Sequence, residues 1–560
     1  MRVSSHKSGI FVKGYSGTSG VLLAMDIAPK LRDGLLGFAI ERAGGNRPQQ
    51  FLRGTAHFPG VPHADGEPTT TDTAPVQRFR WSDYRVFPDT EYHYTIYAVH
   101  GDPAKLELLE GPTIVLHTAS ATSGTHRILF NRAAAASQAF SREFPEFLES
   151  LKGHDKDEPV VLPPDVRAWL SRGVLEQITG FVARAIDPTW ALDIAIYEYE
   201  LPEIVDAVRA ARARGADVRI VYHAKPDDQQ TADNEANLTD WPDDHKRGRI
   251  TNAICHDKFI VLSRLGAGDK RAPQAVLCGS TNFTENGVFR QANVCHAAES
   301  AEVARPYLDL FEQLFSGLDV AGTKDWIDVH DPIVRDVALD VGFSPRSGRV
   351  DLDFFGEEIG AARRDVLFCT AFELDPVIRE ALLGQPHDDV LRLGLQNKRS
   401  EITGFHRDRT ADFVTAAMFN TGLDGVLHES TGGQKGSNYI HTKLMVLNFT
   451  GTAPTVISGS HNFSNNASAN NDENYLIIRG DTEVADCYGI ELMRLYDHYR
   501  ARFISKPPKE GDEPRPAGPC GALKADELCP DDRWVGPYVK DGSLHALDRL
   551  RFAGRPEGAP

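Results

Sequence analysis

The sequence contains the same short constellation twice, and this duplication constrains the fold more than any other feature. A His-x-Lys pair opens an apolar, strand-like run that is followed by Gly-Ser-x-Asn-Phe. The first copy spans residues 254–283 and the second spans residues 440–463. The two histidines lie 185 residues apart and the two Gly-Ser segments lie 180 residues apart. A period of this length indicates a duplicated domain rather than a solenoid of short repeats.

The paired residues are His256 with Lys258 and His441 with Lys443. Side chains two positions apart leave a strand on the same face. We therefore expect each histidine and its lysine to point into one pocket. The Gly-Ser-x-Asn segments add four polar side chains: Ser280, Asn282, Ser460 and Asn462.

These residues resemble the phospholipase D superfamily, whose signature is His-x-Lys-x4-Asp followed by Gly-Ser-x-x-Asn, twice in most members. The resemblance covers roughly residues 125–505. It implies a phosphodiesterase that needs no metal and no cofactor. In this family one histidine attacks phosphorus to form a phosphohistidine, the other protonates the leaving alcohol, and water or an alcohol then releases the product.

Matched by position, His256 is the expected nucleophile and His441 the expected general acid, although the near-symmetry leaves the reverse open. Lys258 and Lys443 are expected to contact the non-bridging phosphate oxygens as compact charges. The resemblance also implies hydrogen bonds from the Asn282 and Asn462 amides, with Ser280 and Ser460 in the same substrate-binding shell.

A nucleophilic imidazole needs an acceptor on its other nitrogen, which fixes the tautomer. Family members use a carboxylate downstream of Gly-Ser-x-Asn. The second copy offers candidates at residues 471–475, of which Glu473 is favoured, whereas residues 290–294 of the first copy hold none. One imidazole is therefore expected to lack its carboxylate, and the sequence leaves open which one.

The sequence departs from the family signature at two positions. The family's Asp after each His-x-Lys is replaced by Ser263 and Asn448, which hydrogen-bond but carry no charge. Because that Asp mainly supports the motif, the change affects rate and local stability more than reaction type.

In the second half Arg407 and Lys435 are candidates for substrate binding, against the alternative of solvated surface.

The elements predict an α/β fold of two duplicated phospholipase D-like domains behind an all-β domain. Residues 1–121 alternate in short runs typical of an immunoglobulin- or fibronectin-like sandwich. Strand, helix and strand patterns then predict repeat 1 over 122–340 and repeat 2 over 341–505. The Pro/Gly-rich residues 506–560 predict an extended tail packed across the body, and the acid-rich residues 225–249 predict a solvated loop or a lid.

Charge, hydropathy and cysteine content indicate what the protein binds, where it is located and whether it has disulfides. The formal net charge of −18 opposes binding to polyanions. Neither a signal peptide nor a membrane span is visible, so we expect a cytoplasmic protein with no integral membrane segment. Seven cysteines, mostly in apolar runs, favour free thiols over a disulfide framework, and only Cys520 and Cys529 could form a bridge. No spacing predicts a zinc site.

The substrate is not settled by these residues. An intracellular phospholipid phosphodiesterase is favoured, because a nuclease usually shows a basic stripe beside its site. A nuclease acting on DNA or RNA is the first alternative. An inactive scaffold is the second, with residues 1–121 docking a protein partner.

Overall fold

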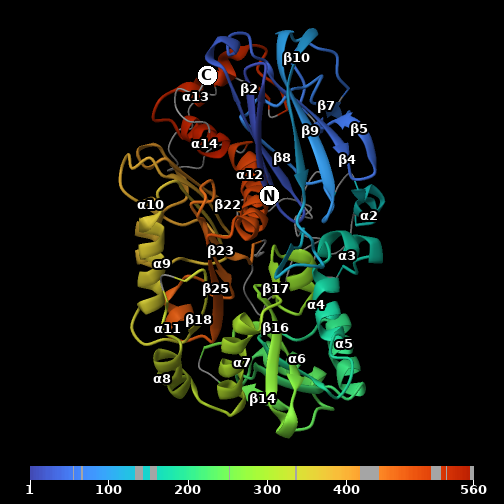
Figure 1. The fold of residues 1–560 in the computed structure, drawn as a ribbon, viewed down its shortest axis with the longest axis vertical. Helices are drawn as coiled ribbons and strands as arrows, with labels where there is room; N and C mark the ends of the chain where they lie inside the picture. Colours follow the sequence, from blue (N-terminus) through green and yellow to red (C-terminus); the bar gives the residue numbers. More distant parts are fainter. Residues whose placement is uncertain are drawn as a thin grey trace.

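In the computed structural model, residues 1–554 are described except for 55, 65–66, 133–139, 141–142, 152–159, 251–252, 335–336, 417–439, 506–518, 522 and 525. Figure 1 shows an all-β part at one end of the molecule and two α/β halves that lie against each other below it. The C-terminal helices return to the all-β end.

The N-terminal part is the expected β-sandwich of two antiparallel sheets, in the orders β1-β2-β3-β8 and β10-β9-β4-β5. Along β9, Tyr92, Tyr94 and Ile96 face the core while alternate residues face outward, the pattern of a strand with one buried face. The strands are β1 (Arg2–Lys7), β2 (Ile10–Ser16), β3 (Val21–Ile27), β4 (Gly37–Gly44), β5 (Arg47–Phe51), β8 (Arg80–Asp83), β9 (Glu91–Asp102) and β10 (Lys105–His117). The short β6 (Arg53–Gly54) and β7 (Thr69–Thr70) form a separate ladder.

The first α/β half is built on a seven-stranded sheet in the order β11-β17-β16-β15-β12-β13-β14. Its strands are β11 (His126–Phe130), β12 (Trp190–Ile196), β13 (Asp217–His223), β14 (Lys246–Arg249), β15 (Lys258–Leu265), β16 (Arg271–Gly279) and β17 (Val294–Ala298). Its helices are α2 (Pro145–Ser150), α3 (Pro164–Ser171), α4 (Val174–Ala183), α5 (Pro202–Ala213), α6 (Gln229–Asn237), α7 (Ala301–Phe315) and α8 (Val320–His330).

The second half is built on an eight-stranded sheet in the order β18-β25-β24-β23-β19-β20-β22-β21. Its strands are β18 (Leu339–Ser344), β19 (Asp365–Thr370), β20 (Leu391–Gln396), β21 (Gly404–His406), β22 (Ala411–Thr415), β23 (Lys443–Leu447), β24 (Thr455–Gly459) and β25 (Glu473–Arg479). Its helices are α9 (Val350–Ala361), α10 (Pro376–Leu383), α11 (Asn465–Ala469) and α12 (Thr482–Ser505).

The two sheets share one topology. In the first, β12 pairs in parallel with β13 and antiparallel with β15. In the second, β19 pairs in the same senses with β20 and β23, and the remaining strands follow the same order apart from the added β21. The predicted α/β duplication is therefore confirmed by strand order and direction. The exact domain limits at residues 121, 340 and 505 stay predictions.

One hydrophobic core joins all three parts. It contains α7, α12, the inner faces of both large sheets, and Tyr15, Leu22 and Ala24 of the sandwich. Helices α3, α4 and α5 cover the other face of the first sheet, and α9 and α10 cover the other face of the second. This arrangement holds the two His-x-Lys strands, β15 and β23, in fixed relation.

Two predictions about connecting segments need correction. Residues 225–249 contain α6 and the sheet strand β14, so they are not simply a loop. The described C-terminal residues lie against the β-sandwich, and they are helical in α13 (Gly536–Val539) and α14 (Leu544–Ala553). The Ser543 hydroxyl caps α14 and Gly554 ends it in a left-handed conformation, which outweighs the local Pro/Gly content.

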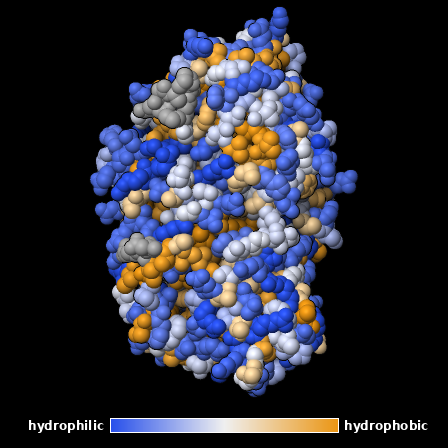
Figure 2. Space-filling view, viewed as in Figure 1, coloured by the Kyte–Doolittle hydropathy of each residue, from blue (hydrophilic) through white to orange (hydrophobic). Residues whose placement is uncertain are grey.

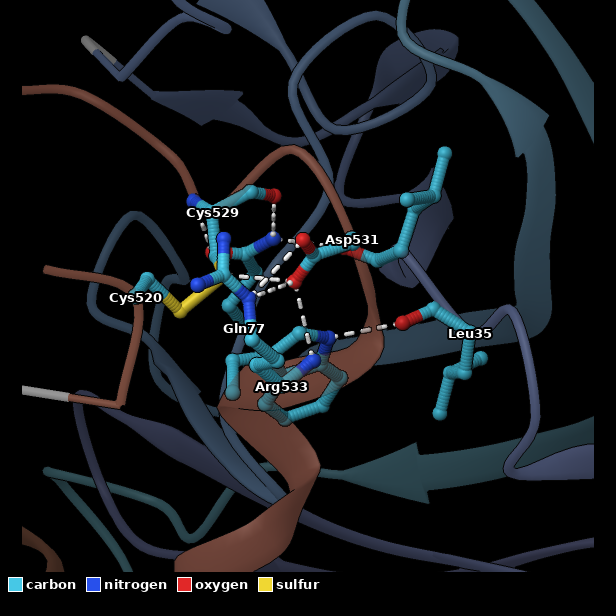
Figure 3. Close-up of a disulfide and its surroundings, with 8 residues drawn as sticks. Leu35, Gln77, Cys520, Cys529, Asp531 and Arg533 are labelled. Carbon is cyan, nitrogen blue, oxygen red and sulfur yellow. Dashed lines mark hydrogen bonds and ion pairs between the residues drawn. A yellow bond between two sulfur atoms is a disulfide. The ribbon is translucent and has the colours of Figure 1, made fainter.

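The Cys520–Cys529 disulfide forms as the sequence suggested (Figure 3), and the other five cysteines are buried free thiols. Beside it, the Gln77 amide donates to the Cys529 carbonyl at 2.7 Å and the Trp534 indole donates to the Leu35 carbonyl at 2.8 Å. The C-terminal segment is thereby attached to the β-sandwich.

The face in Figure 2 is largely hydrophilic, with small hydrophobic patches. Among the helices that the structure describes, none is long and apolar enough to cross a bilayer.

Candidate active site

The two histidines lie where the halves meet, and each is held by the opposite half. The backbone N–H of His256 donates to the Asp472 carbonyl at 2.9 Å, and that of His441 donates to the Ala292 carbonyl at 3.0 Å. The residues before both histidines form isolated parallel bridges with the same two partners. The segment that carries each catalytic histidine is therefore bound to the opposite repeat.

This crossing brings the predicted catalytic residues together. The ring centroids of His256 and His441 are 6.2 Å apart with the rings nearly perpendicular. Lys258 and Lys443 are the first residues of β15 and β23. All four side chains are buried, and the more exposed histidine, His441, is only 5% accessible.

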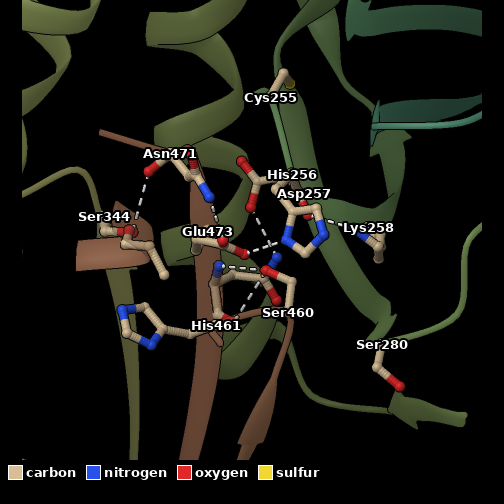
Figure 4. Close-up of polar contacts among 12 residues, drawn as sticks. Cys255, His256, Asp257, Lys258, Ser280, Ser344, Ser460, His461, Asn471 and Glu473 are labelled. Carbon is tan, nitrogen blue, oxygen red and sulfur yellow. Dashed lines mark hydrogen bonds and ion pairs between the residues drawn. The ribbon is translucent and has the colours of Figure 1, made fainter. Parts of the chain in front are cut away.

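Glu473 is the acceptor for His256 (Figure 4). Its Oε2 lies 2.6 Å from Nδ1 of His256, and its Oε1 accepts from the Asn471 amide at 3.0 Å. A carboxylate on Nδ1 leaves Nε2 with its lone pair free for attack. The carboxylate favoured from the sequence thus serves the histidine of the other repeat.

His441 has an uncharged acceptor. Its Nδ1 lies 3.1 Å from Oδ1 of Asn293 and 3.1 Å from the Ser280 carbonyl oxygen. Asn293 was not among the predicted site residues. Its position was a usable signal, because Asn293 follows Gly279 by the same 14 residues that separate Glu473 from Gly459.

The two lysines supply the positive charge. Nζ of Lys258 donates to the His256 carbonyl at 2.7 Å and lies 5.3 Å from the ring of Tyr197. Nζ of Lys443 lies 5.9 Å from the ring of Phe372 and has no hydrogen-bond partner among the described residues. An unpaired buried ammonium is costly unless an anion joins it.

Burial and mutual repulsion shift the ionisation of these groups. Burial and the two lysines lower the pKa of His256 well below its usual range, and the pKa of His441 falls in the same way. Burial lowers the pKa of Lys258 to about 8 and raises that of Glu473 to about 7. These shifts disfavour positive charge on the histidines and on Lys258 in the absence of an anion, and a bound phosphate would oppose the loss of each positive charge.

The two asparagines are at the same site. Nδ2 of Asn282 donates to Glu198, while Oδ1 of Asn282 and Oδ1 of Asn462 have no partner in the described part of the chain. Both side chains are buried. Glu198 was not predicted; it is a partly exposed carboxylate just after β12.

Ser280 and Ser460 have a supporting role rather than the predicted substrate contact. Their hydroxyl groups accept the backbone N–H groups of Val294 and Asn474 at 3.1 and 3.0 Å. Both side chains are fully buried. They hold the start of β17 and of β25 against the Gly-Ser turns.

Neither basic candidate adds to the described site. Arg407 is exposed, in a 3-10 turn before β22. Because β22, β20 and β19 are parallel and the site lies at their carboxyl ends, Arg407 lies at the opposite edge of the sheet. The expected substrate contact of Arg407 is therefore not supported. Lys435 lies outside the described residues.

Ser263 and Asn448, which stand where the family has Asp, lie at the ends of their strands away from the catalytic lysines. Ser263 is buried near the end of β15. Asn448 follows β23, and its Oδ1 accepts the backbone N–H groups of Arg363 and Arg364 at 2.8 and 3.0 Å. An amide oxygen performs this turn-holding role without charge.

A buried ion pair behind His256 was missed by the sequence analysis. Arg249 donates to both carboxylate oxygens of Asp472 at 2.8 and 2.7 Å. The same Asp472 provides the carbonyl that holds His256. No motif signals this pair, because its members are 223 residues apart.

Part of the chain matches a known protein family. Residues 186–315, which include His256, Lys258 and Asn293, match the family described as cardiolipin synthase, PLD-like domain. The chain contains a phospholipase D-like domain. The expected resemblance to the phospholipase D superfamily is confirmed by this match.

Solved structures show weaker likeness. Polyphosphate kinase from Porphyromonas gingivalis aligns with a TM-score of 0.40 and 12% identity over 59% of this chain, which covers 46% of the kinase. Phosphatidylserine synthase from Haemophilus influenzae aligns with a TM-score of 0.40 and 11% identity over 59% of this chain and 86% of the synthase. The phospholipase D family member Nuc from Salmonella typhimurium aligns with a TM-score of 0.21 and 17% identity over 29% of this chain and 95% of Nuc. No curated protein sequence matches significantly.

Proposed function

We propose that this phospholipase D-like protein is a metal-independent phosphodiesterase that works through a phosphohistidine at His256. The observation that carries the proposal is the arrangement of two facing imidazoles, one of which has Glu473 on Nδ1. A nucleophile whose tautomer is fixed by a carboxylate, opposite a second imidazole, is the arrangement that two-step displacement at phosphorus needs.

In the first step, Nε2 of His256 forms a bond to phosphorus, and the bond from phosphorus to the leaving oxygen breaks. His441 gives its Nε2 proton to that oxygen. In the second step, His441 takes a proton from water, the water oxygen bonds to phosphorus, and the phosphorus–nitrogen bond breaks. Lys258 and Lys443 stabilise the charge on the non-bridging oxygens.

We propose a phospholipid as the substrate. The net charge of −18 opposes the approach of a polyanion such as DNA. A description of the matching family as cardiolipin synthase, PLD-like domain, supports a lipid phosphodiester. Nuclease activity is retained as an outcome of the test.

The test is hydrolysis of bis(p-nitrophenyl) phosphate in excess EDTA by wild type, His256→Ala and His441→Ala. His93→Ala, an exposed histidine of the sandwich, is the matched control. We expect EDTA-resistant turnover that both site variants lose and the control keeps. Phosphatidylcholine vesicles and single-stranded DNA then identify the natural class. A folded wild-type protein inactive on all three substrates would instead support the scaffold alternative.

A further inference from the structure

The two repeats place different chemistry at one equivalent position. Glu473 and Asn293 each follow their Gly-Ser turn at the same spacing and each reach Nδ1 of the histidine from the other repeat. The flanking backbone bridges are also equivalent. The two imidazoles therefore differ in their Nδ1 acceptors: His256 has the Glu473 carboxylate, whereas His441 has the Asn293 amide together with the Ser280 carbonyl.

The amide of Asn293 is held in one orientation. Its Nδ2 donates to the Gly287 carbonyl at 2.9 Å, and its Oδ1 accepts from the Ser280 hydroxyl at 2.8 Å. Asn131 accepts the backbone N–H of Asn293 at 2.9 Å. Oδ1 is thus committed to face His441, and Asn293 is completely buried.

This difference separates the two histidines in basicity. A carboxylate stabilises the positive charge that an imidazole acquires when its Nε2 bonds to phosphorus. An amide oxygen stabilises that charge less, so the imidazolium of His441 releases its proton more readily. The hydrogen-bond acceptor on Nδ1 of each imidazole then decides which histidine is the nucleophile and which is the acid.

We propose that Asn293 is a positioning residue that keeps His441 in the role of acid, and that the phosphoryl group forms on whichever histidine receives a carboxylate from the opposite repeat. This inference rests on the proposed phosphohistidine mechanism. In the variant Asn293→Asp/Glu473→Gln the roles exchange. Nε2 of His441 bonds to phosphorus, the bond to the leaving oxygen breaks, and His256 gives its Nε2 proton to that oxygen.

The test maps the phosphorylated histidine. Wild type, Glu473→Gln, Asn293→Asp and the double variant are mixed with bis(p-nitrophenyl) phosphate, quenched in alkali within one turnover, and digested for mass spectrometry. The label is the p-nitrophenyl phosphoryl group that remains on the attacking histidine. We expect it on His256 in wild type, on both histidines in Asn293→Asp, and on His441 in the double variant. Turnover of the double variant is expected to fall by at least about tenfold, because a carboxylate in place of the Asn293 amide cannot donate to the Gly287 carbonyl.

Folding is checked by circular dichroism and thermal melting before labelling. A folded double variant labelled on His256, or on neither histidine, overturns the inference while leaving the proposed function intact. If the double variant does not fold, Asn293→Asp alone decides, and a label confined to His256 overturns it. Absence of any phosphohistidine in active wild-type protein overturns the proposed mechanism together with the inference.

Discussion

Glu473 and Lys258 set the pH range over which the proposed chemistry runs. Glu473, with a pKa near 7, must be ionised to accept the Nδ1 proton of His256, so activity falls as the pH drops below about 7. Lys258, with a pKa near 8, must be charged to bind phosphate, so activity falls as the pH rises above about 8. We predict a bell-shaped profile of kcat at saturating diester, where the bound phosphate keeps His441 protonated, with its maximum between these values.

Glu473→Gln removes the acidic side of that profile. The amide still fills the space beside His256 but carries no charge, so we expect kcat to fall by about 10²-fold or more. The measurement is kcat from pH 5 to 9 at saturating diester for the variant and wild type. An acidic limb that persists unchanged in the variant would assign it to another group.

Glu198 offers a test of site charge. It bonds to Asn282 and raises the pKa values of Lys258 and Lys443 by its negative charge. We expect Glu198→Gln to lower KM for an anionic diester about two- to tenfold, because one repulsive charge is removed. Glu203→Gln, in α5, makes the same charge change and should leave KM unaltered. Equal KM values in wild type and Glu198→Gln would contradict the prediction.

Among the elements, the end of β14 and the start of β25 are tied by the Arg249–Asp472 pair. Removing one member leaves the other charge buried, so Arg249→Met should lower the free energy of unfolding by about 3–5 kcal/mol. The measurement is urea unfolding. Arg249→Met/Asp472→Leu leaves no unpaired charge and should recover much of the loss. Equal stability of the single and double variants would show that charge burial is not the cause.

Element identity was largely readable from the sequence. The apolar runs after Lys258 and Lys443 predicted β15 and β23, and the structure contains both. The helix α14 was missed because its cap residues lie in a segment dominated by turn-forming composition. Its stability comes from tertiary contacts, since Phe552 packs against Tyr15 and Phe449, and local propensity does not report such contacts.

At the scale of the whole molecule, the sandwich, the second repeat and the C-terminal segment are joined. Arg2 of β1 pairs with Asp486 of α12 at 2.8 Å, and Arg549 of α14 pairs with Asp26 of β3 at 2.7 Å. Both aspartates are almost completely buried. The sandwich is therefore part of the folded body rather than a tethered module.

The disulfide should matter for this assembly but not for catalysis. A loop of 9 residues closed by Cys520–Cys529 contributes roughly 2–3 kcal/mol by chain entropy. We expect dithiothreitol to lower the stability of the C-terminal segment, followed by limited proteolysis, while diester hydrolysis is unchanged. Cys520→Ser/Cys529→Ser is the control and should not respond to reductant. Loss of hydrolysis on reduction would contradict the separation of the two regions.

The sequence by itself determined the duplicated α/β plan, the N-terminal sandwich and the two His-x-Lys pairs, because periodicity and short motifs involve residues close in the chain. Only the tertiary structure decided which acceptor holds which imidazole. Glu473 and His256 are 217 residues apart, and they meet because each repeat passes a loop to the other. The same packing excluded Arg407 from the site, since its strand direction puts it at the far edge of the sheet. The motifs identify the reactive side chains. The proposed difference in role between the two histidines follows from how the two similar sheets pack together.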